Sequence, residues 1–89
     1  MAWTIDYSGK ALRQIRKLEK QTAERILKYM EEVAELENAR SFGRALTGPL
    51  GTLWRYRVGD YRVICDIQDI CVRILVVEIG HRSSLSITR

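Results

Sequence analysis

The stretch of sequence that decides the fold is LWRYRVGDYRVICDI, residues 53–67, whose side chains alternate in character on both sides of a Gly59-Asp60 pair. A Gly-Asp dipeptide suits a two-residue turn, and alternation of apolar and polar side chains is typical of a strand with one buried face. The stretch therefore predicts a β-hairpin. Its apolar face fits a core and carries two opposed pairs: Trp54 with Cys65, and Tyr56 with Val63.

The other face of the predicted hairpin carries three arginines, Arg55, Arg57 and Arg62. In this register Arg57 stands directly opposite Arg62, and like charges paired across strands are destabilising. No acidic residue accompanies the three guanidinium groups in this register. Because arginine binds phosphate through parallel hydrogen bonds, we expect this face to hold a ligand with several phosphate groups.

Length and composition predict a single domain, residues 1–89, with one core to which every amphipathic element contributes. The hydrophobic share of 46% and the charged share of 29% exclude a disordered chain. No apolar run approaches the roughly 18 residues of a membrane span, and the N-terminal residues lack the pattern of a secretory signal. We therefore expect a cytoplasmic protein that does not contact a membrane.

The positive charge is concentrated in the second half of the chain. Residues 39–89 contain eight arginines, no lysine and four acidic residues, whereas basic and acidic residues balance in residues 1–38. An arginine-rich segment of this kind favours a nucleic-acid partner.

The two cysteines, Cys65 and Cys71, lack the spacing of a metal-binding motif. Free cysteine behaves mostly as a small buried hydrophobe. We expect reduced, structural thiols, no metal site and no small-molecule cofactor.

The N-terminal part predicts a strand followed by two helices. Residues 3–7 (WTIDY) alternate and are rich in β-forming side chains, and Ser8 suits the N-cap of a helix. The apolar stripe of the first helix has four residues: Ala11, Leu12, Ile15 and Leu18. After a break near residues 19–21, the clearest helical periodicity in the chain predicts a second helix with six apolar residues on one side: Ala23, Ile26, Leu27, Met30, Val33 and Ala34.

Residues 38–51 contain three glycines and a proline and predict a loop, from which Arg40 and Arg44 add to the positive surface. Residues 71–79, after the hairpin, form a nearly unbroken apolar run that is typical of a central strand. With Asp69 and Ile70 as the connecting turn, Arg73 faces Asp66, and the register predicts a structural ion pair between them.

The elements thus follow the order β-α-α-β-β-β. This order predicts an α+β domain with a mostly antiparallel four-stranded sheet. The two N-terminal helices pack on one face of the sheet, and the arginines lie on the other.

The last predicted strand ends at Gly80-His81-Arg82, which contains the only histidine in the chain. Glycine leaves the backbone free to turn the next two side chains out of the sheet. Histidine titrates near neutral pH and suits proton transfer. The pattern is equally compatible with an ordinary surface histidine.

The order of elements, the segment LTGPLGTLWRYRVGDYRVICDI at residues 46–67 and the ending VEIGHR at residues 77–82 resemble the RelE/ParE superfamily of bacterial toxins from type II toxin–antitoxin systems. The resemblance extends over residues 3–82. It implies an endoribonuclease that cleaves mRNA in the ribosomal A site and inhibits translation, through metal-free attack of the ribose 2′-hydroxyl on the adjacent phosphate. It also implies a cognate RelB-like antitoxin, with mRNA and the ribosome as the other partners.

The resemblance, together with the arginines of the hairpin, implies two sets of functional residues. They are the catalytic residues Arg62, His81 and Arg82 and the RNA phosphate-binding residues Arg55, Arg57 and Arg44.

Two features depart from the RelE pattern. RelE-type ribonucleases often have a tyrosine several residues after the last-strand arginine, and Ser86 stands there in this chain. The hairpin bases are arginines rather than lysines, and a guanidinium that stays protonated is an inefficient proton shuttle. Either His81 transfers the protons, or catalysis is weak or lost. A ParE-like inhibitor of DNA gyrase and a module that only binds an antitoxin are the alternatives.

Overall fold

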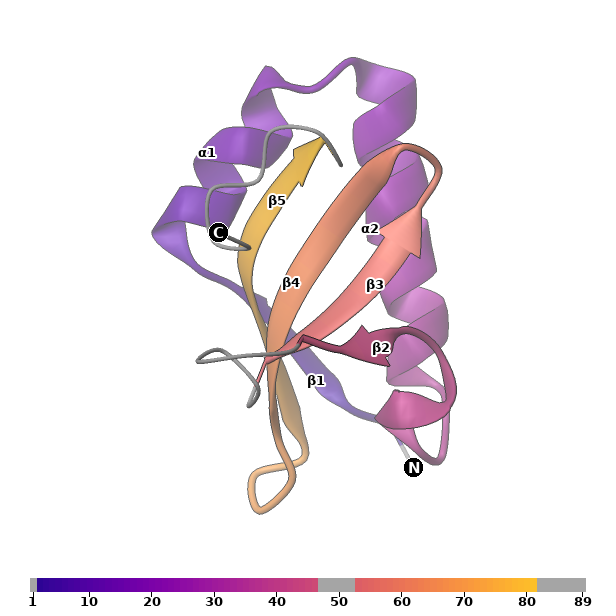
Figure 1. The fold of residues 1–89 in the computed structure, drawn as a ribbon. Helices are drawn as coiled ribbons and strands as arrows, with labels where there is room; N and C mark the ends of the chain where they lie inside the picture. The colour runs from indigo at the N-terminus through magenta and orange to yellow at the C-terminus, as the bar shows by residue number, and fades with distance from the viewer. Residues whose placement is uncertain (1, 47–52, 82–89) are drawn as a thin grey trace.

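The computed structural model describes residues 2–46 and 53–81 of the chain. Its elements along the sequence are β1 (Thr4–Tyr7), α1 (Gly9–Lys17), α2 (Lys20–Ala34), the 3-10 turn η1 (Ala39–Ser41), β2 (Arg44–Ala45), β3 (Trp54–Val58), β4 (Tyr61–Gln68) and β5 (Arg73–His81). The strands form one five-stranded sheet in the order β1-β5-β4-β3-β2 (Figure 1). In the part of the chain that the structure describes, no helix is long and apolar enough to cross a membrane.

The predicted α+β class is confirmed, with one strand more than expected. Strand β1 runs parallel to β5, and the other neighbouring strands are antiparallel. The additional strand is β2, whose two residues lie in the segment that the sequence predicted to be a loop. Glycines in that segment indicated a loop, but local composition does not reveal pairing with β3, whose partner residues are nine and eleven positions away.

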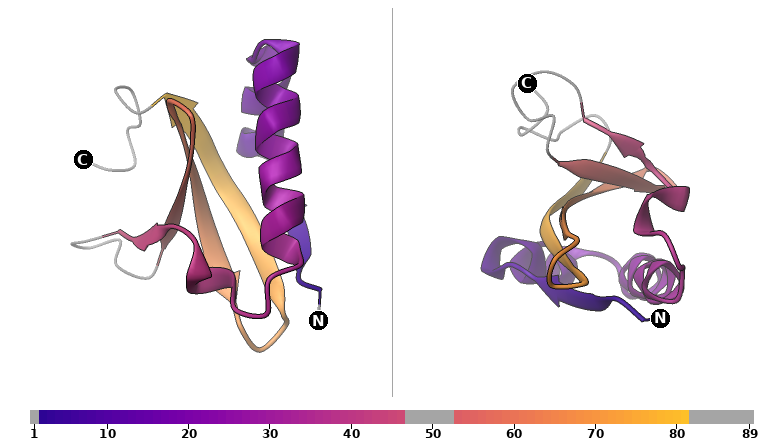
Figure 2. Two further views of the ribbon diagram at one scale, coloured as in Figure 1. Left: turned by 90° about the vertical axis from the view of Figure 1, so that its right-hand side faces the viewer. Right: turned by 90° about the horizontal axis from the view of Figure 1, so that it is seen from below.

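Both helices cover the same face of the sheet, as predicted (Figure 2). The core lies between the two layers and is built largely from the apolar stripe of α2 and the inward side chains of β3, β4 and β5. The Oγ atom of Ser8 accepts a hydrogen bond from the amide of Ala11 at 3.0 Å, which confirms the predicted N-cap of α1. Leu12, which we expected in the buried stripe of α1, is instead 43% exposed.

Helix α1 also covers the edge of β5. Strand β1 ends at Tyr7, opposite Val76, so the described residues place no strand beside the rest of β5 on that side. There the hydroxyl of Ser8 donates to the carbonyl of Val77 at 3.0 Å, and the amide of Ile79 donates to Oε1 of Gln14 at 2.6 Å. Side chains of α1 and its cap thus satisfy backbone groups that would otherwise form an open sheet edge.

The register of the central hairpin is the one that the sequence predicted. Trp54 pairs with Cys65, Tyr56 with Val63, and Arg57 with Arg62. Gly59 in the turn has φ +60°, a conformation that side chains other than glycine rarely adopt.

The connection from β4 to β5 is longer than predicted. Gln68 pairs with Arg73, so the turn has four residues, 69–72, instead of the Asp69-Ile70 pair. The predicted ion pair between Arg73 and Asp66 is therefore wrong. Arg73 instead approaches Asp6 of the parallel strand β1, with 2.8 Å between Nε and Oδ2.

Candidate functional site

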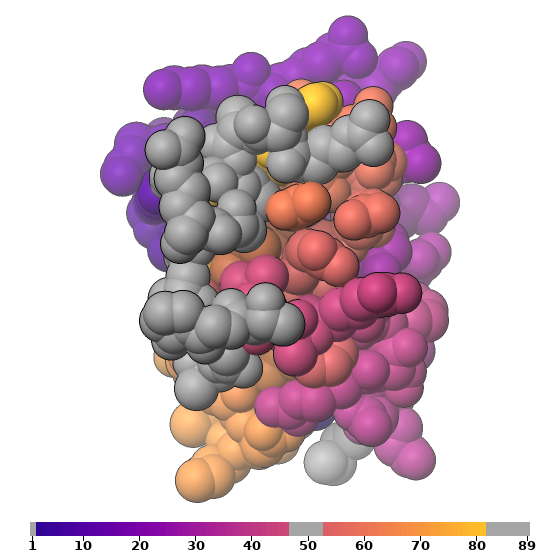
Figure 3. All heavy atoms as spheres, in the orientation of Figure 1, coloured from indigo at the N-terminus to yellow at the C-terminus, as the bar shows by residue number. Residues whose placement is uncertain are grey.

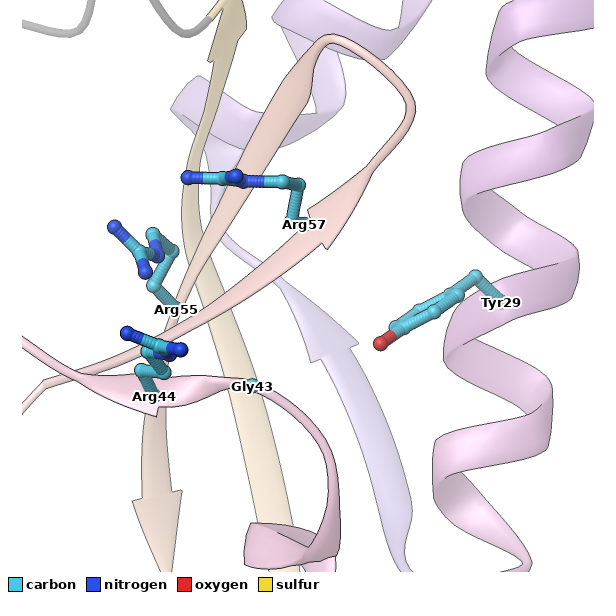
Figure 4. Close-up of a pocket in the computed structure, with 5 residues that line it drawn as sticks. All are labelled: Tyr29, Gly43, Arg44, Arg55 and Arg57. Carbon is cyan, nitrogen blue, oxygen red and sulfur yellow. The ribbon is translucent and has the colours of Figure 1, made fainter.

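Four arginines from three strands gather on the face of the sheet that turns away from the helices. We call this surface the arginine face, and its members are Arg44, Arg55, Arg57 and Arg62. Two cross-strand pairs place them there, Arg44 opposite Arg55 and Arg57 opposite Arg62. The side chains of β2 and β3 reach the surface on this side of the molecule (Figure 3), and those of Arg44, Arg55 and Arg57 lie close together (Figure 4).

The arginine face is electrostatically unsatisfied. Within residues 2–46 and 53–81, none of its four guanidinium groups forms an ion pair with a carboxylate. Two causes lower the pKa of the Arg55 guanidinium from its ordinary value: first burial, and then the positive charges of Arg57, Arg62 and Arg44. The Nε atom of Arg62 is buried and has no hydrogen-bond partner in the same part of the chain. Such a cluster favours an anionic ligand, because each bound phosphate removes repulsion and supplies acceptors.

A cavity of about 310 Å³ opens between these arginines and α2. Its lining consists of Tyr29, Gly43, Arg44, Arg55 and Arg57 (Figure 4). The volume is at the lower end of the range for small-ligand sites, roughly 300–1,000 Å³. The cavity therefore has room for part of a nucleotide, with three arginines and a tyrosine in its lining.

Tyr29 is a site residue that the sequence did not reveal. It projects from α2, and its hydroxyl points toward the strands across the cavity (Figure 4). Burial, and then the charge of Glu32, raises the pKa of Tyr29, so the hydroxyl stays protonated and can donate a hydrogen bond. The one signal in the sequence is its spacing, since Tyr29 follows the buried Ile26 by three residues and borders the apolar stripe.

Arg44 is placed by a segment that is fixed at both ends. The hydroxyl of Tyr56 donates to the carbonyl of Ala39 at 2.6 Å, and Nε1 of Trp54 donates to the carbonyl of Phe42 at 2.7 Å. Between these contacts and Arg44 lies Gly43, which has φ +80°. A Cβ atom on Gly43 would lie 2.4 Å from the carbonyl oxygen of Arg55, so only glycine permits this close approach of β2 to β3.

Arg40 does not contribute to the arginine face, contrary to our expectation. Its two terminal nitrogens donate to both carboxylate oxygens of Asp69 at 2.8 and 2.9 Å, and its guanidinium lies 5.9 Å from the ring centroid of Trp54. The hydrogen bond from Arg40 is the main cause that lowers the pKa of Asp69. Arg40 therefore has a structural role, since it ties the segment before β2 to the turn between β4 and β5.

His81 and Arg62, both predicted to be catalytic, lie on different faces of the sheet. Arg62 stands opposite Gly80, whereas His81 stands opposite Tyr61 and contacts its ring edge-on, with the centroids 5.6 Å apart. Tyr61 packs against the core on the helix side. Strand β5 continues through His81 instead of ending before it, so the expected turn of this side chain out of the sheet does not occur. Arg82 and Ser86 lie outside the described residues.

Two acidic residues lie on the side of the sheet that carries the arginine face: Asp66, four residues after Arg62 on β4, and Glu78, which the sequence-based register did not include. Glu78 on β5 stands opposite Ile64, and Ile64 stands opposite Arg55. The carboxylate is bound by Lys10 from α1, with 2.7 Å between Nζ and Oε1. The apolar run around Glu78 gave no indication of this partner, which is 68 residues away.

Comparisons with solved structures show the fold. The toxin–antitoxin complex RelBE2 from Mycobacterium tuberculosis contains a chain that superposes with a TM-score of 0.83 at 19% identity, over 94% of this chain and 95% of that one. For the intact RelBE toxin–antitoxin complex of E. coli the TM-score is 0.74 at 23% identity, with 90% and 96% covered. The archaeal RelE–RelB complex from Pyrococcus horikoshii gives 0.72 at 22% identity, with 96% and 100% covered.

Comparison with curated proteins found no match. The family model described as the ParE toxin of the type II toxin–antitoxin system parDE matches residues 5–85, which is nearly the whole chain. This range includes both helices and the strands that carry the arginine face. The chain therefore belongs to the ParE toxin family, within the RelE/ParE superfamily.

Proposed function

We propose that this chain is a toxin that binds mRNA on its arginine face and cleaves it, thereby inhibiting translation. The observation that carries the proposal is the gathering of four arginines on one face with no acidic partner among the described residues. Arginine pairs with phosphate through two parallel hydrogen bonds, and a row of such groups follows the backbone of a single strand of RNA. The hydroxyl of Tyr29 adds a donor at the side of the row.

The proposed reaction needs three groups around one phosphate. The 2′-oxygen of the ribose loses its proton and bonds to phosphorus, and the bond from phosphorus to the 5′-oxygen breaks. A second proton goes to this leaving oxygen, so the products are a 2′,3′-cyclic phosphate and a 5′-hydroxyl. Arg62 would stabilise the charge on phosphorus, because its Nε atom has no hydrogen-bond partner among the described residues and it stands opposite Gly80, which has no side chain.

His81 is our proposed acid or base, and its position defines where RNA must pass. It follows Gly80 along β5 but presents its ring on the side of Tyr61. For Arg62 and His81 to act on one phosphate, this phosphate must lie at the end of the sheet, where the two residues occupy adjacent ladder positions on opposite faces. Arg82 comes next in the sequence and is proposed as a further phosphate ligand.

Primer extension on mRNA from cells that express the chain alone tests this proposal. We expect new 5′ ends at positions that follow the reading frame, which indicates cleavage on the ribosome. Purified protein with naked RNA provides the second arm, since cleavage there would show that the ribosome is dispensable. Intact mRNA in both arms would refute the cleavage proposal.

Inhibition of DNA gyrase is a second candidate, favoured by the ParE family model and by the separation of His81 from Arg62. In this case the arginine face would bind its partner and would catalyse no reaction. A supercoiling assay with purified gyrase distinguishes the two functions. Loss of supercoiling together with intact mRNA would favour gyrase.

We further propose that a RelB-like antitoxin binds this chain. The similar folds from Mycobacterium tuberculosis, E. coli and Pyrococcus horikoshii occur in toxin–antitoxin complexes. Co-expression with the product of the neighbouring gene should give a complex that elutes earlier than the chain alone in size-exclusion chromatography. A chain that binds this protein but acts on neither mRNA nor gyrase would be only an antitoxin-binding module.

A further inference from the structure

The arginine face contains one carboxylate that can compete with RNA for Arg62. Glu78 is only 4% exposed, and its position opposite Ile64 places it on that face. Arg62 stands opposite Gly80, two residues further along β5. Glu78 and Arg62 are thus diagonal neighbours in an antiparallel pair, with Cα atoms about 7–8 Å apart, a distance that long side chains span. Gly80 has no side chain to separate them.

The competing pair nevertheless does not form, because Glu78 already has a partner. Nζ of Lys10 lies 2.7 Å from Oε1 of Glu78 and donates a hydrogen bond to it. Arg62, in contrast, retains a buried Nε without a hydrogen-bond partner in the described residues. A buried carboxylate strongly favours a cationic partner, so whichever base reaches Glu78 determines whether Arg62 stays available.

Lys10 reaches Glu78 because α1 lies along the edge of β5. The cap residue Ser8 donates to the carbonyl of Val77, and Gln14 accepts from the amide of Ile79. These two contacts lie on both sides of Glu78 in β5, and they fix the first turns of α1 against the strand. The side chain of Lys10, which is half exposed, extends from there to the carboxylate.

We infer that Lys10 is a positioning residue which, by binding Glu78, keeps the guanidinium of Arg62 free for a phosphate of the RNA. This inference rests on the proposed function of the arginine face. In the absence of Lys10, Glu78 pairs with Arg62 across the diagonal. The face then loses the guanidinium whose Nε atom is buried, although no residue that contacts RNA has been changed.

Binding of a short single-stranded 2′-O-methyl RNA, which 2′-hydroxyl attack cannot cleave, provides the first test. Lys10→Met should weaken binding about tenfold, the factor for one lost charge-assisted hydrogen bond. The double variant Lys10→Met/Glu78→Gln should regain the wild-type affinity, because its Arg62 has no competitor. Lys17→Met, which removes an exposed lysine from the same helix, should cause a smaller loss.

The outcomes of this test are distinct. Unchanged binding by Lys10→Met would overturn the inference. If the double variant bound RNA as weakly as Lys10→Met, the inference would also be overturned, because Lys10 would then act on RNA directly. A Lys10→Met protein that does not fold counts against it too, since Glu78 would have found no new partner. Wild-type protein that does not bind the RNA would instead contradict the proposed function.

A second measurement tests the inference without RNA. In ¹⁵N NMR spectra of the free protein, the Nε–H signal of Arg62 should shift in Lys10→Met as the new ion pair forms. The signal should return to its wild-type position in the double variant. Assignment comes from the resonance that Arg62→Lys removes. A signal that stays at the wild-type position in Lys10→Met would show that Glu78 does not reach Arg62.

Discussion

Arg57 on β3 stands directly opposite Arg62 on β4, and this pair lies beside a second pair of like charge formed by Arg44 and Arg55. Each such pair costs up to about 1 kcal/mol relative to a neutral pair. The free protein therefore carries a destabilised surface on strands β2, β3 and β4 of its sheet. A bound polyanion would relieve this repulsion, so we expect ligand binding and stability to be coupled on this face.

Replacement of Arg62 separates function from stability. In Arg62→Ala the repulsion with Arg57 disappears, and so does a buried Nε for which the described part of the chain supplies no hydrogen-bond partner. The thermal midpoint should therefore stay the same or rise. RNA cleavage should fall, and the slope of binding affinity against salt should decrease by about 0.7, as for one lost phosphate contact. Arg16→Ala, on the exposed side of α1, serves as the control for loss of charge. A strongly lowered midpoint would show instead that Arg62 is structural.

Gly43 should be essential for the placement of Arg44. In Gly43→Ala the new Cβ meets the carbonyl of Arg55 at 2.4 Å, and the backbone has φ +80°, so we expect destabilisation of about 1–3 kcal/mol and displacement of β2. Denaturant unfolding measures the loss of stability, and RNA affinity measures the effect of displacing β2. The matched control is Gly9→Ala, where the new Cβ meets only Nη1 of Arg13 at 3.5 Å. Equal stability of the two variants would contradict this explanation of β2.

His81 is tested by a pair of substitutions. If His81 transfers a proton, His81→Ala should reduce cleavage about 100- to 10,000-fold. His81→Phe keeps a ring next to Tyr61, and so preserves the edge-on contact at 5.6 Å while it removes the titrating group. Both variants should be equally inactive, and only His81→Ala should be less stable. Activity that survives in His81→Phe would assign the histidine a packing role.

The sequence was informative where short-range chemistry determines the structure. The alternation around Gly59-Asp60 was sufficient for the correct register of β3 and β4, and therefore for the pairing of Arg57 with Arg62. The helices followed from their periodicity and from the cap at Ser8. In these cases the residues that determine the structure lie close together in the sequence.

Several of the errors concern contacts between segments that are distant in the sequence, and others concern where a turn or a strand ends. The pairing of β2 with β3 depends on a glycine conformation that the composition of a loop does not specify. The turn between β4 and β5 has four residues, which moved Arg73 from Asp66 to Asp6. Successive side chains along a strand point to opposite faces of the sheet. The continuation of β5 through His81 therefore placed this side chain on the helix side. Lys10 and Glu78, 68 residues apart, could not be paired from sequence.

Alkaline pH should unfold the protein through buried hydroxyl and thiol groups. Burial, followed by the charges of Cys65 and Glu31, raises the pKa of Tyr7 to about 12, from an ordinary value of 10.0. Burial also raises the pKa of the Cys65 thiol. Because the folded state holds these protons more tightly than the unfolded state, their contribution to stability is complete below the ordinary pKa values and is lost as pH rises. Denaturant midpoints should therefore be constant near neutral pH and decrease above about pH 9, where an exposed thiol begins to ionise.

Tyr7→Phe should match the wild type at pH 7 and be more stable than it between pH 10 and 12, since phenylalanine cannot ionise. If the two proteins lost stability in parallel over that interval, Tyr7 would have no part in the alkaline transition.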